Sequence, residues 1–367
     1  MSETNAAPRI ALFPGNGIGQ EVAYGSLPLL RELFPGWEIT EGRIGWDCWC
    51  SGGDAVPPES WELARASDAL LVGAITSKPA REAELELVPS LQGKGLQYRS
   101  PVVQLRRELD LYANVRPTVD PTGRVDVTVV RENTEGTYVH DLDAGHLGDL
   151  RDVIGDDPTV RQSDPSDVAV ALRVTTGFAW RRLLRTCGRL ARRSRGHVTV
   201  ADKPNIMQAT GEIVRAAMEE VAAEFDDVDF VMGNADAVAM RMAADPESLD
   251  VVAAENLIGD ILSDLGAGLG GGMGVTPSAN HGDGPAMFEP VHGSAPDIAG
   301  RGIANPTAFL LSAAMCGTHV GDVDAATRLR TAVGEMLRDG DPAELTPDLG
   351  GHGTTETVLR AVANRLG

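Results

Sequence analysis

The feature of this sequence that most constrains its fold is an alternation of short apolar runs with longer amphipathic ones. Short runs rich in β-branched residues are typical of buried strands, and they occur at "RIALF", "DALLVGAI", "VDVTVVRE", "HVTVAD", "VDFVMG" and "LDVVAAEN". Helical patterns lie between them at "FAWRRLLRTCGRLARR" and "TGEIVRAAMEEVAAEF". Strands and helices that alternate in this way predict an α/β fold.

Length and composition limit the class of protein. A chain of 367 residues is longer than one hydrophobic core usually organises, so we expect two domains. The formal net charge of -21 argues against a nucleic-acid partner, because it repels phosphate backbones. We find no apolar run long enough for a membrane span and no signal-peptide pattern, and we therefore expect a cytoplasmic protein with no membrane partner. The four cysteines lack zinc-site spacing and are expected to be reduced thiols.

One segment, "VVAAENLIGDILSDLGAG", sets Asn256, Asp260 and Asp264 four residues apart among aliphatic residues. On a helix these three side chains form one stripe. The neighbouring apolar face would consist of Leu257, Ile258, Ile261, Leu262 and Leu265. The stripe is either the solvated face of an amphipathic helix or half of a divalent-cation site, since two carboxylates one turn apart can share one hard ion.

Basic residues are distributed unevenly along the chain. Arg106, Arg116 and Arg131 lie in a short segment that leads to Tyr138, and three such guanidinium groups can clamp a substrate with several carboxylates. Lys203 is one of only three lysines, which indicates a role that needs a group able to release its proton. The glycine-rich "GNGIG" turn is, by itself, a weak indication of dinucleotide binding, because it lacks the third glycine of that pattern.

Several longer motifs carry a resemblance to a known family. They are "LFPGNGIGQEV", "LDLYANVRP", "VRENTEGTY", "DKPNIM", "ENLIGDILSD" and "FEPVHGSAPDIAGRGIANP". With these motifs, in this order, the chain resembles the isocitrate/isopropylmalate dehydrogenase family, the metal-dependent β-decarboxylating dehydrogenases. The resemblance implies a two-domain α/β fold with a discontinuous cofactor-side domain, residues 1–111 and 271–367. Residues 112–270 would form the central substrate and dimerisation domain, with an arm at about 139–170.

The resemblance also implies a role for individual residues. Mg²⁺ or Mn²⁺ would be bound by Asp260 and Asp264 of one subunit and by Asp236 of the other. The catalytic pair would be Tyr138 and Lys203, with Lys203 contributed by the second subunit, so a homodimer with shared active sites is implied. The substrate-binding residues would be Ser100, Arg106, Arg116, Arg131 and Asn205. The cofactor-binding residues would be Glu289, His292, Gly293, Asp297, Ile298 and Asn305.

The implied reaction is the oxidative decarboxylation of a 3-substituted malate to a 2-oxo acid and CO₂. Lys203 would accept the proton of the 2-hydroxyl group, and Tyr138 would protonate the carbon after CO₂ is lost. Relatives that prefer NADP often carry Lys and Tyr where this chain has Asp297 and Ile298. A carboxylate at this position repels a 2′-phosphate, so we expect NAD to be the cofactor.

The substrate's C3 substituent is the point on which the sequence leaves alternatives. Ser100, with Arg99 nearby, favours an anionic tail, as in isocitrate, homoisocitrate or a phosphonate analogue. Val102 and Val103 favour 3-isopropylmalate, and a tartrate-type substrate is a further alternative. A noncatalytic regulatory subunit is an alternative of another class, but the set of expected catalytic and metal-binding residues is complete.

Overall fold

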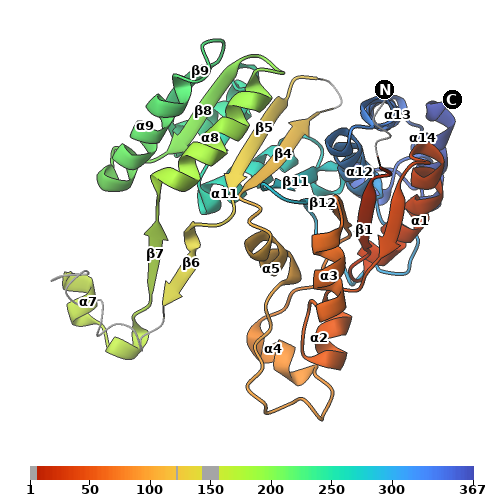
Figure 1. Ribbon diagram of the computed structural model, residues 1–367, viewed down its shortest axis with the longest axis horizontal. Helices are drawn as coiled ribbons and strands as arrows, with labels where there is room; N and C mark the ends of the chain where they lie inside the picture. The colour runs from red at the N-terminus through yellow and green to blue at the C-terminus, as the bar shows by residue number, and fades with distance from the viewer. Residues whose placement is uncertain (1–5, 121–122, 143–156) are drawn as a thin grey trace.

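A ten-stranded mixed sheet is the framework of the molecule in the computed structural model, which describes residues 6–120, 123–142 and 157–367 (Figure 1). The strand order is β2-β1-β3-β12-β11-β4-β5-β10-β8-β9. The antiparallel pairs all involve β4 or β11, and the remaining neighbours are parallel. The strands are β1 (Arg9–Phe13), β2 (Glu38–Glu41), β3 (Ala69–Val72), β4 (Ala113–Val119), β5 (Asp126–Glu132), β8 (His197–Asp202), β9 (Asp229–Asn234), β10 (Val251–Ala254), β11 (Pro277–His281) and β12 (Ala286–Pro290).

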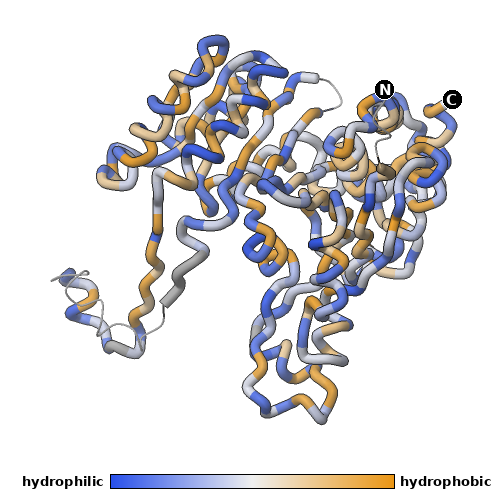
Figure 2. Tube along the Cα trace, in the orientation of Figure 1, coloured by the Kyte–Doolittle hydropathy of each residue, from blue (hydrophilic) through white to orange (hydrophobic). Residues whose placement is uncertain are grey.

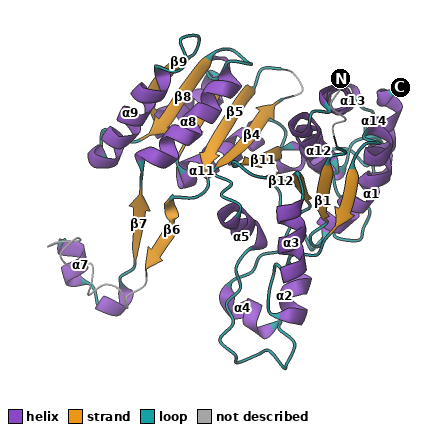
Figure 3. Cartoon of the chain, in the orientation of Figure 1, coloured by secondary structure: helices purple, strands orange, loops and turns teal. Residues whose placement is uncertain are grey.

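Helices flank this sheet, and α2 and α4 form an extension beyond it, below α3 (Figure 3). The helices are α1 (Ile18–Leu33), α2 (Trp46–Gly52), α3 (Pro58–Ala66), α4 (Ala80–Leu85), α5 (Pro101–Glu108), α7 (Pro158–Gln162), α8 (Gly177–Ala191), α9 (Gln208–Ala222), α10 (Ala235–Ala244), α11 (Asn256–Leu269), α12 (Thr307–Val320), α13 (Val323–Asp339) and α14 (Thr355–Leu366). Short 3₁₀ turns are η2 (Pro165–Asp167), η3 (Pro246–Ser248), η4 (Met273–Val275) and η5 (Pro347–Leu349).

The predicted α/β fold is confirmed, and each expected strand and helix is present at its predicted place. The apolar strands carry the core, because their alternate side chains are covered by helices on the two faces of the sheet. Figure 2 shows hydrophobic residues concentrated along these strands. The largest buried side chains include Phe13, Trp180 and Phe288. No helix in the described ranges is long and apolar enough to cross a membrane.

The N- and C-terminal segments and the middle of the chain occupy different halves of the sheet. Strands β1, β2, β3 and β12 lie on one side, and β5, β8, β9 and β10 lie on the other. Strands β4 and β11 pair with each other at the centre, so the sheet is continuous across the predicted boundary. The division into domains at residues 111 and 271 stays a prediction.

A separate two-stranded ribbon extends from the body of the molecule. It consists of β6 (Gly136–Leu142) and β7 (Val170–Val174), which pair antiparallel, with α7 near its far end (Figure 1). The ribbon lies where the sequence predicts an arm, at about residues 139–170. Residues 143–156 of that predicted arm lie outside the described residues.

Candidate active site

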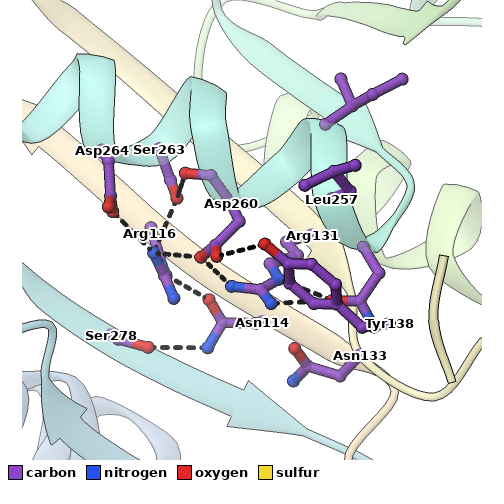
Figure 4. A network of polar contacts seen from close by, with 12 residues as sticks. Asn114, Arg116, Arg131, Asn133, Tyr138, Leu257, Asp260, Ser263, Asp264 and Ser278 are labelled. Carbon is purple, nitrogen blue, oxygen red and sulfur yellow. Dashed lines mark hydrogen bonds and ion pairs between the residues drawn. The ribbon is translucent and has the colours of Figure 1, made fainter. Parts of the chain in front are cut away.

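The stripe on α11 faces a group of arginines rather than water alone (Figure 4). The helix begins where the Glu255 side chain accepts hydrogen bonds from the amides of Leu257 and Ile258. Along the stripe, exposure increases from the buried Asn256 to Asp260 and then to Asp264, whose side chain is 55% exposed. The stripe is therefore not a simple solvated face.

The apolar face predicted for this helix was wrong at one position. Ile261 is 60% exposed, whereas its neighbour Leu262 is buried. The sequence period cannot distinguish a residue that faces the core from one that lies at the edge of the apolar stripe, because both fit the same spacing.

Two buried arginines lie opposite the stripe. Arg116 on β4 donates to the carbonyl oxygen of the Asn114 side chain at 2.7 Å and to Ser263 Oγ at 2.7 Å, and lies 3.2 Å from Asp264 Oδ1. Arg131, on the adjacent antiparallel strand β5, donates to Asn256 Oδ1 and forms an ion pair with Asp260. These contacts hold both guanidinium groups towards α11.

Burial changes the acid–base properties of this group. Burial, together with the neighbouring positive charge of Arg106, lowers the pKa of Arg131 to about 10 and lowers the pKa of Arg116. Burial also raises the pKa of Asp264, although Arg116 opposes that shift. Arg131 remains protonated at neutral pH, so the cluster keeps a positive charge that can bind carboxylates.

Tyr138, on the ribbon strand β6, completes this part of the site. Its hydroxyl group donates to Asp260 Oδ2 at 3.2 Å, and the guanidinium carbon of Arg131 lies 5.5 Å from the centre of its ring. Burial and the negative charge of Asp260 raise the pKa of Tyr138, so the phenol keeps its proton at neutral pH. A protonated phenol beside a carboxylate can act as a proton donor.

Arg106 borders a second part of the site, a cavity of about 170 Å³. Arg106 forms an ion pair at 2.8 Å with Glu289, which also accepts a hydrogen bond from Asn280. Lining residues from the predicted substrate and cofactor sets are Ser100, Arg106, Arg116, Glu289, His292 and Gly293. The two predicted sets thus meet in one cavity.

Only some of the residues that the sequence predicts near the substrate's C3 substituent line this cavity. Ser100 and Val102 both line it. Val103 is 47% exposed and Arg99 is also exposed, and neither belongs to the lining. The interpretation that Val103 and Arg99 border the substituent is therefore not supported in this conformation, because both side chains point to solvent.

Lys203 and Asp236 form a separate pair. Lys203 follows β8 and Asp236 lies in the first turn of α10, and Lys203 Nζ donates to Asp236 Oδ1 at 2.6 Å. This hydrogen bond lowers the pKa of Asp236. No hydrogen bond or ion pair between described residues joins the pair to Asp260, Asp264 or Tyr138. Asn205, close by, is exposed.

Two carboxylates of one chain fit a hard divalent cation. Asp260 and Asp264 are partly exposed and lie one helical turn apart, and carboxylate oxygens are the ligands that Mg²⁺ and Mn²⁺ take. Within the described part of the chain, no three His, Cys, Asp or Glu side chains converge into a metal-binding group.

The predicted cofactor loop follows β12. Asp297 is exposed, and Ile298 packs partly buried against the main core. His292 lines the cavity that Arg106 borders, and its Nε2 atom is buried without a hydrogen-bond partner among the described residues. A buried nitrogen atom without a partner fits a site for a polar ligand. The side chain of Asn305 already has internal partners, Asp348 and the amide of Thr307.

The "GNGIG" turn packs against this loop. A Cβ atom at Gly17 would lie 2.3 Å from the carbonyl oxygen of Ser294. A Cβ atom at Gly15 would lie 2.2 Å from the carbonyl oxygen of Ala74. The glycines are thus needed for close backbone approach. Buried Asn16 accepts hydrogen bonds from the amides of Trp46 and Thr76, so its amide group connects the turn to two other segments.

Sequence reasoning did not single out the polar side chains that hold the arginines. Asn114 donates to Ser278 and Asn280 and accepts from Arg116. Its place two residues before Arg116 on one strand was a usable indication, because alternate residues of a strand share a face. Ser263 and Asn280 offered no comparable indication.

Comparisons with known proteins agree with this fold. The family model described as isocitrate/isopropylmalate dehydrogenase matches residues 9–362. An isocitrate/homoisocitrate dehydrogenase of Thermus thermophilus is 41% identical, covering 98% of this chain and 99% of the relative. Protein DlpA of Legionella pneumophila is 40% identical over 96% of this chain, which spans only 58% of that relative's length. The crystal structure of isocitrate dehydrogenase from Methylococcus capsulatus has a TM-score of 0.82 at 34% identity, covering 98% of this chain and 99% of that chain.

These comparisons define the class of enzyme, a decarboxylating dehydrogenase. The chain belongs to the isocitrate/isopropylmalate dehydrogenase family. The predicted family, fold class and enzyme type, a decarboxylating dehydrogenase, are confirmed by this membership.

Proposed function

We propose that this protein catalyses the NAD- and divalent-metal-dependent oxidative decarboxylation of a 3-substituted malate with an anionic tail, isocitrate or a close analogue. The observation that carries the proposal is that carboxylate and guanidinium groups lie next to each other. The carboxylates of Asp260 and Asp264 lie one turn apart, against the buried guanidinium groups of Arg116 and Arg131. Such a site can bind a cation and the carboxylates of its substrate together.

The chain's own residues account for most of the reaction. Arg106, Arg116 and Arg131 bind and orient the malate carboxylates, and Tyr138 holds a proton for the carbon that loses CO₂. Asp260 and Asp264 would hold Mg²⁺ or Mn²⁺, which when bound lowers the cost of negative charge on the substrate's oxygen atoms. His292 and Asp297, in the loop after β12, would hold NAD, which when bound supplies the hydride acceptor.

The active site is proposed to be shared between two subunits of a homodimer. Lys203 and Asp236 form their own pair, and among the described residues the carboxylates paired with Arg116 and Arg131 are those of Asp260 and Asp264. A second copy that brings its Lys203 and Asp236 to this cluster would supply the proton acceptor and the third ligand. The exposed side chains of Ile261 and Met240 are consistent with burial at such an interface.

For the substrate, Ser100 supports an anionic C3 substituent, since its hydroxyl group lines the cavity beside Arg106. The name of the Thermus thermophilus relative, isocitrate/homoisocitrate dehydrogenase, points the same way. 3-Isopropylmalate is the second candidate, because Val102 lines the same cavity and could contact an alkyl group.

A panel assay tests the proposal. NAD reduction in the presence of Mg²⁺ or Mn²⁺ is measured with isocitrate, homoisocitrate, a phosphonate analogue, tartrate and 3-isopropylmalate. We expect the anionic tails to give the highest kcat/KM, and the Ser100→Ala variant to lose activity with those substrates alone. A 3-isopropylmalate rate above all the anionic ones would favour the second candidate. Binding without NAD reduction for every compound would indicate a noncatalytic regulatory subunit.

A further inference from the structure

A second cavity, of about 900 Å³, lies on the opposite face of the central strands from Arg116. Asn114 and Arg116 on β4 face the α11 carboxylates, whereas Val115, Pro117 and Val119 line this second cavity. Alternate residues of a strand point to opposite faces, so the two cavities are separated by the sheet itself. We call the second one the back-face cavity.

Three helices close the back-face cavity, and each turns one face towards it. From α13 the lining residues are Arg330, Val333, Gly334, Leu337 and Arg338. Their spacing of three and four residues is that of a single helical face. Helix α12 contributes Leu311 and Met315 at the same spacing, and α8 contributes Leu190. The wall between the charged positions is therefore mainly aliphatic.

Four arginines line this cavity: Arg189, Arg193, Arg330 and Arg338. None of them has a carboxylate within ion-pair distance among the described residues, and Arg189 donates only to the hydroxyl group of Thr186. Asp120 is the acidic residue of the lining, and it accepts a hydrogen bond from the amide of Val125.

Other arginines of the same helical region are paired. Arg181, Arg185 and Arg192 form ion pairs with Glu220, Glu224 and Asp227. Acidic partners are abundant in a chain with a net charge of -21. Four arginines without ion pairs around one apolar cavity are therefore a local concentration of positive charge, which favours an anionic ligand.

Two histidines, His281 and His319, also line the cavity. His281 and His319 have ring centroids 5.6 Å apart, and the edge of His281 contacts Phe288. Burial, with a smaller effect of His319, lowers the pKa of His281 to about 4, so its ring is uncharged at neutral pH. The His281 ring thus adds no charge to that of the arginines that line the cavity.

We propose that the back-face cavity binds an amphipathic organic anion, a carboxylate with an aliphatic body the size of a medium-chain fatty acid. The volume of about 900 Å³ is within the range of sites for small molecules. The aliphatic wall would cover the hydrocarbon chain, and the guanidinium groups can bind the carboxylate with two hydrogen bonds. The site is independent of the reaction proposed above, because it shares neither cavity nor ligand with it.

Calorimetric titration of the full chain with decanoate, kept well below its aggregation concentration, tests this assignment. Decanol serves as the uncharged probe and acetate as the anion without a tail. We expect one decanoate per chain, decanol binding at least about tenfold weaker, and no binding of acetate. Equal affinity for decanoate and decanol, or uptake of many decanoate molecules per chain, would overturn the proposal.

Two variants locate the bound decanoate. The double variant Arg330→Gln with Arg338→Gln should bind decanoate at least about tenfold more weakly and decanol unchanged. Arg192→Gln, which removes an arginine already paired with Asp227, is the matched control and should keep wild-type affinity. Gly334→Leu, which places an isobutyl group in the lining, should weaken binding of both probes.

The Gly334→Leu variant is expected to fold, because a Cβ atom there meets nothing within 4 Å and leucine has the higher helix propensity. Its circular dichroism spectrum and melting temperature check this directly. Wild-type decanoate affinity in folded Gly334→Leu would place the ligand elsewhere and contradict the assignment.

Discussion

The two faces of strand β4 show how one stretch of sequence can serve two purposes. On one face, Arg116 is buried and contacts Asn114, Ser263 and two aspartates. On the other face, Val115 lines an aliphatic cavity whose arginines have no carboxylate partners in the described part of the chain. A buried guanidinium group needs polar partners, whereas one at the mouth of an open cavity is solvated by water. We therefore propose that the first face serves the chemistry and the second only binding.

The largest expected effect comes from removing a carboxylate on the catalytic face. Asp260→Asn should reduce kcat at least about a thousandfold, because the contribution of a bound cation amounts to several kcal/mol. NAD binding, measured by fluorescence titration, should be largely retained. Wild-type protein treated with EDTA should lose activity and regain it with Mg²⁺ or Mn²⁺. Full activity in EDTA would show that the reaction does not need a divalent metal ion.

Adjacent residues on β4 allow a direct comparison of its two faces. Arg116→Lys should lower kcat/KM by about a hundredfold or more, since an ammonium group cannot reproduce the forked contacts of a guanidinium. Val115→Ala should instead cost about 1–2 kcal/mol of unfolding free energy and little activity. Urea unfolding and steady-state kinetics separate the two effects. The reverse pattern would show that the faces are wrongly assigned.

The cofactor loop should give an intermediate effect. We expect wild-type protein to prefer NAD over NADP by at least about tenfold in kcat/KM, equivalent to about 1.4 kcal/mol. Replacing Asp297 by Lys and Ile298 by Tyr should narrow or invert this ratio, because the repulsion of a 2′-phosphate is removed. A wild-type preference for NADP would contradict the role given to Asp297.

The smallest effect is expected on the back face. Arg330→Gln combined with Arg338→Gln should change kcat/KM by less than about twofold and the unfolding free energy by no more than about 0.5 kcal/mol, because exposed positions without ion pairs contribute little. Kinetics without added organic acid and a urea melt measure both. A large loss of activity would mean that the two faces are coupled.

The fold was largely predictable because its strands and helices carry distinct periods. The runs at β5, β8 and β10 are apolar over most of their length, as expected of strands covered by helices on both faces. The catalytic residues proposed from family motifs stay a prediction, whereas the spacing of Asp260 and Asp264 explains their proximity on α11.

Other features depend on contacts between distant segments. The hydrogen bonds of Asn114 with Asn280 and of Arg116 with Ser263 join residues more than a hundred positions apart. The back-face cavity likewise requires α8 and α13 to lie opposite each other. The periodicity of a short segment cannot predict such contacts between distant segments. The exposure of Val103 and Ile261 was missed for the same reason, because the side on which a side chain lies is set by tertiary packing.

The most direct test of a shared catalytic site is the mixing of two inactive variants, Lys203→Ala and Asp260→Asn. If each site combines Lys203 of one subunit with Asp260 of the other, a mixed dimer has one intact site of two, and the purified mixed dimer should show about half of wild-type activity. Co-expression with two different tags, followed by purification of the mixed dimer and assay with the best substrate, measures this. If both residues act within one chain, the mixed dimer will be as inactive as its parents, and the account of a shared site will be wrong.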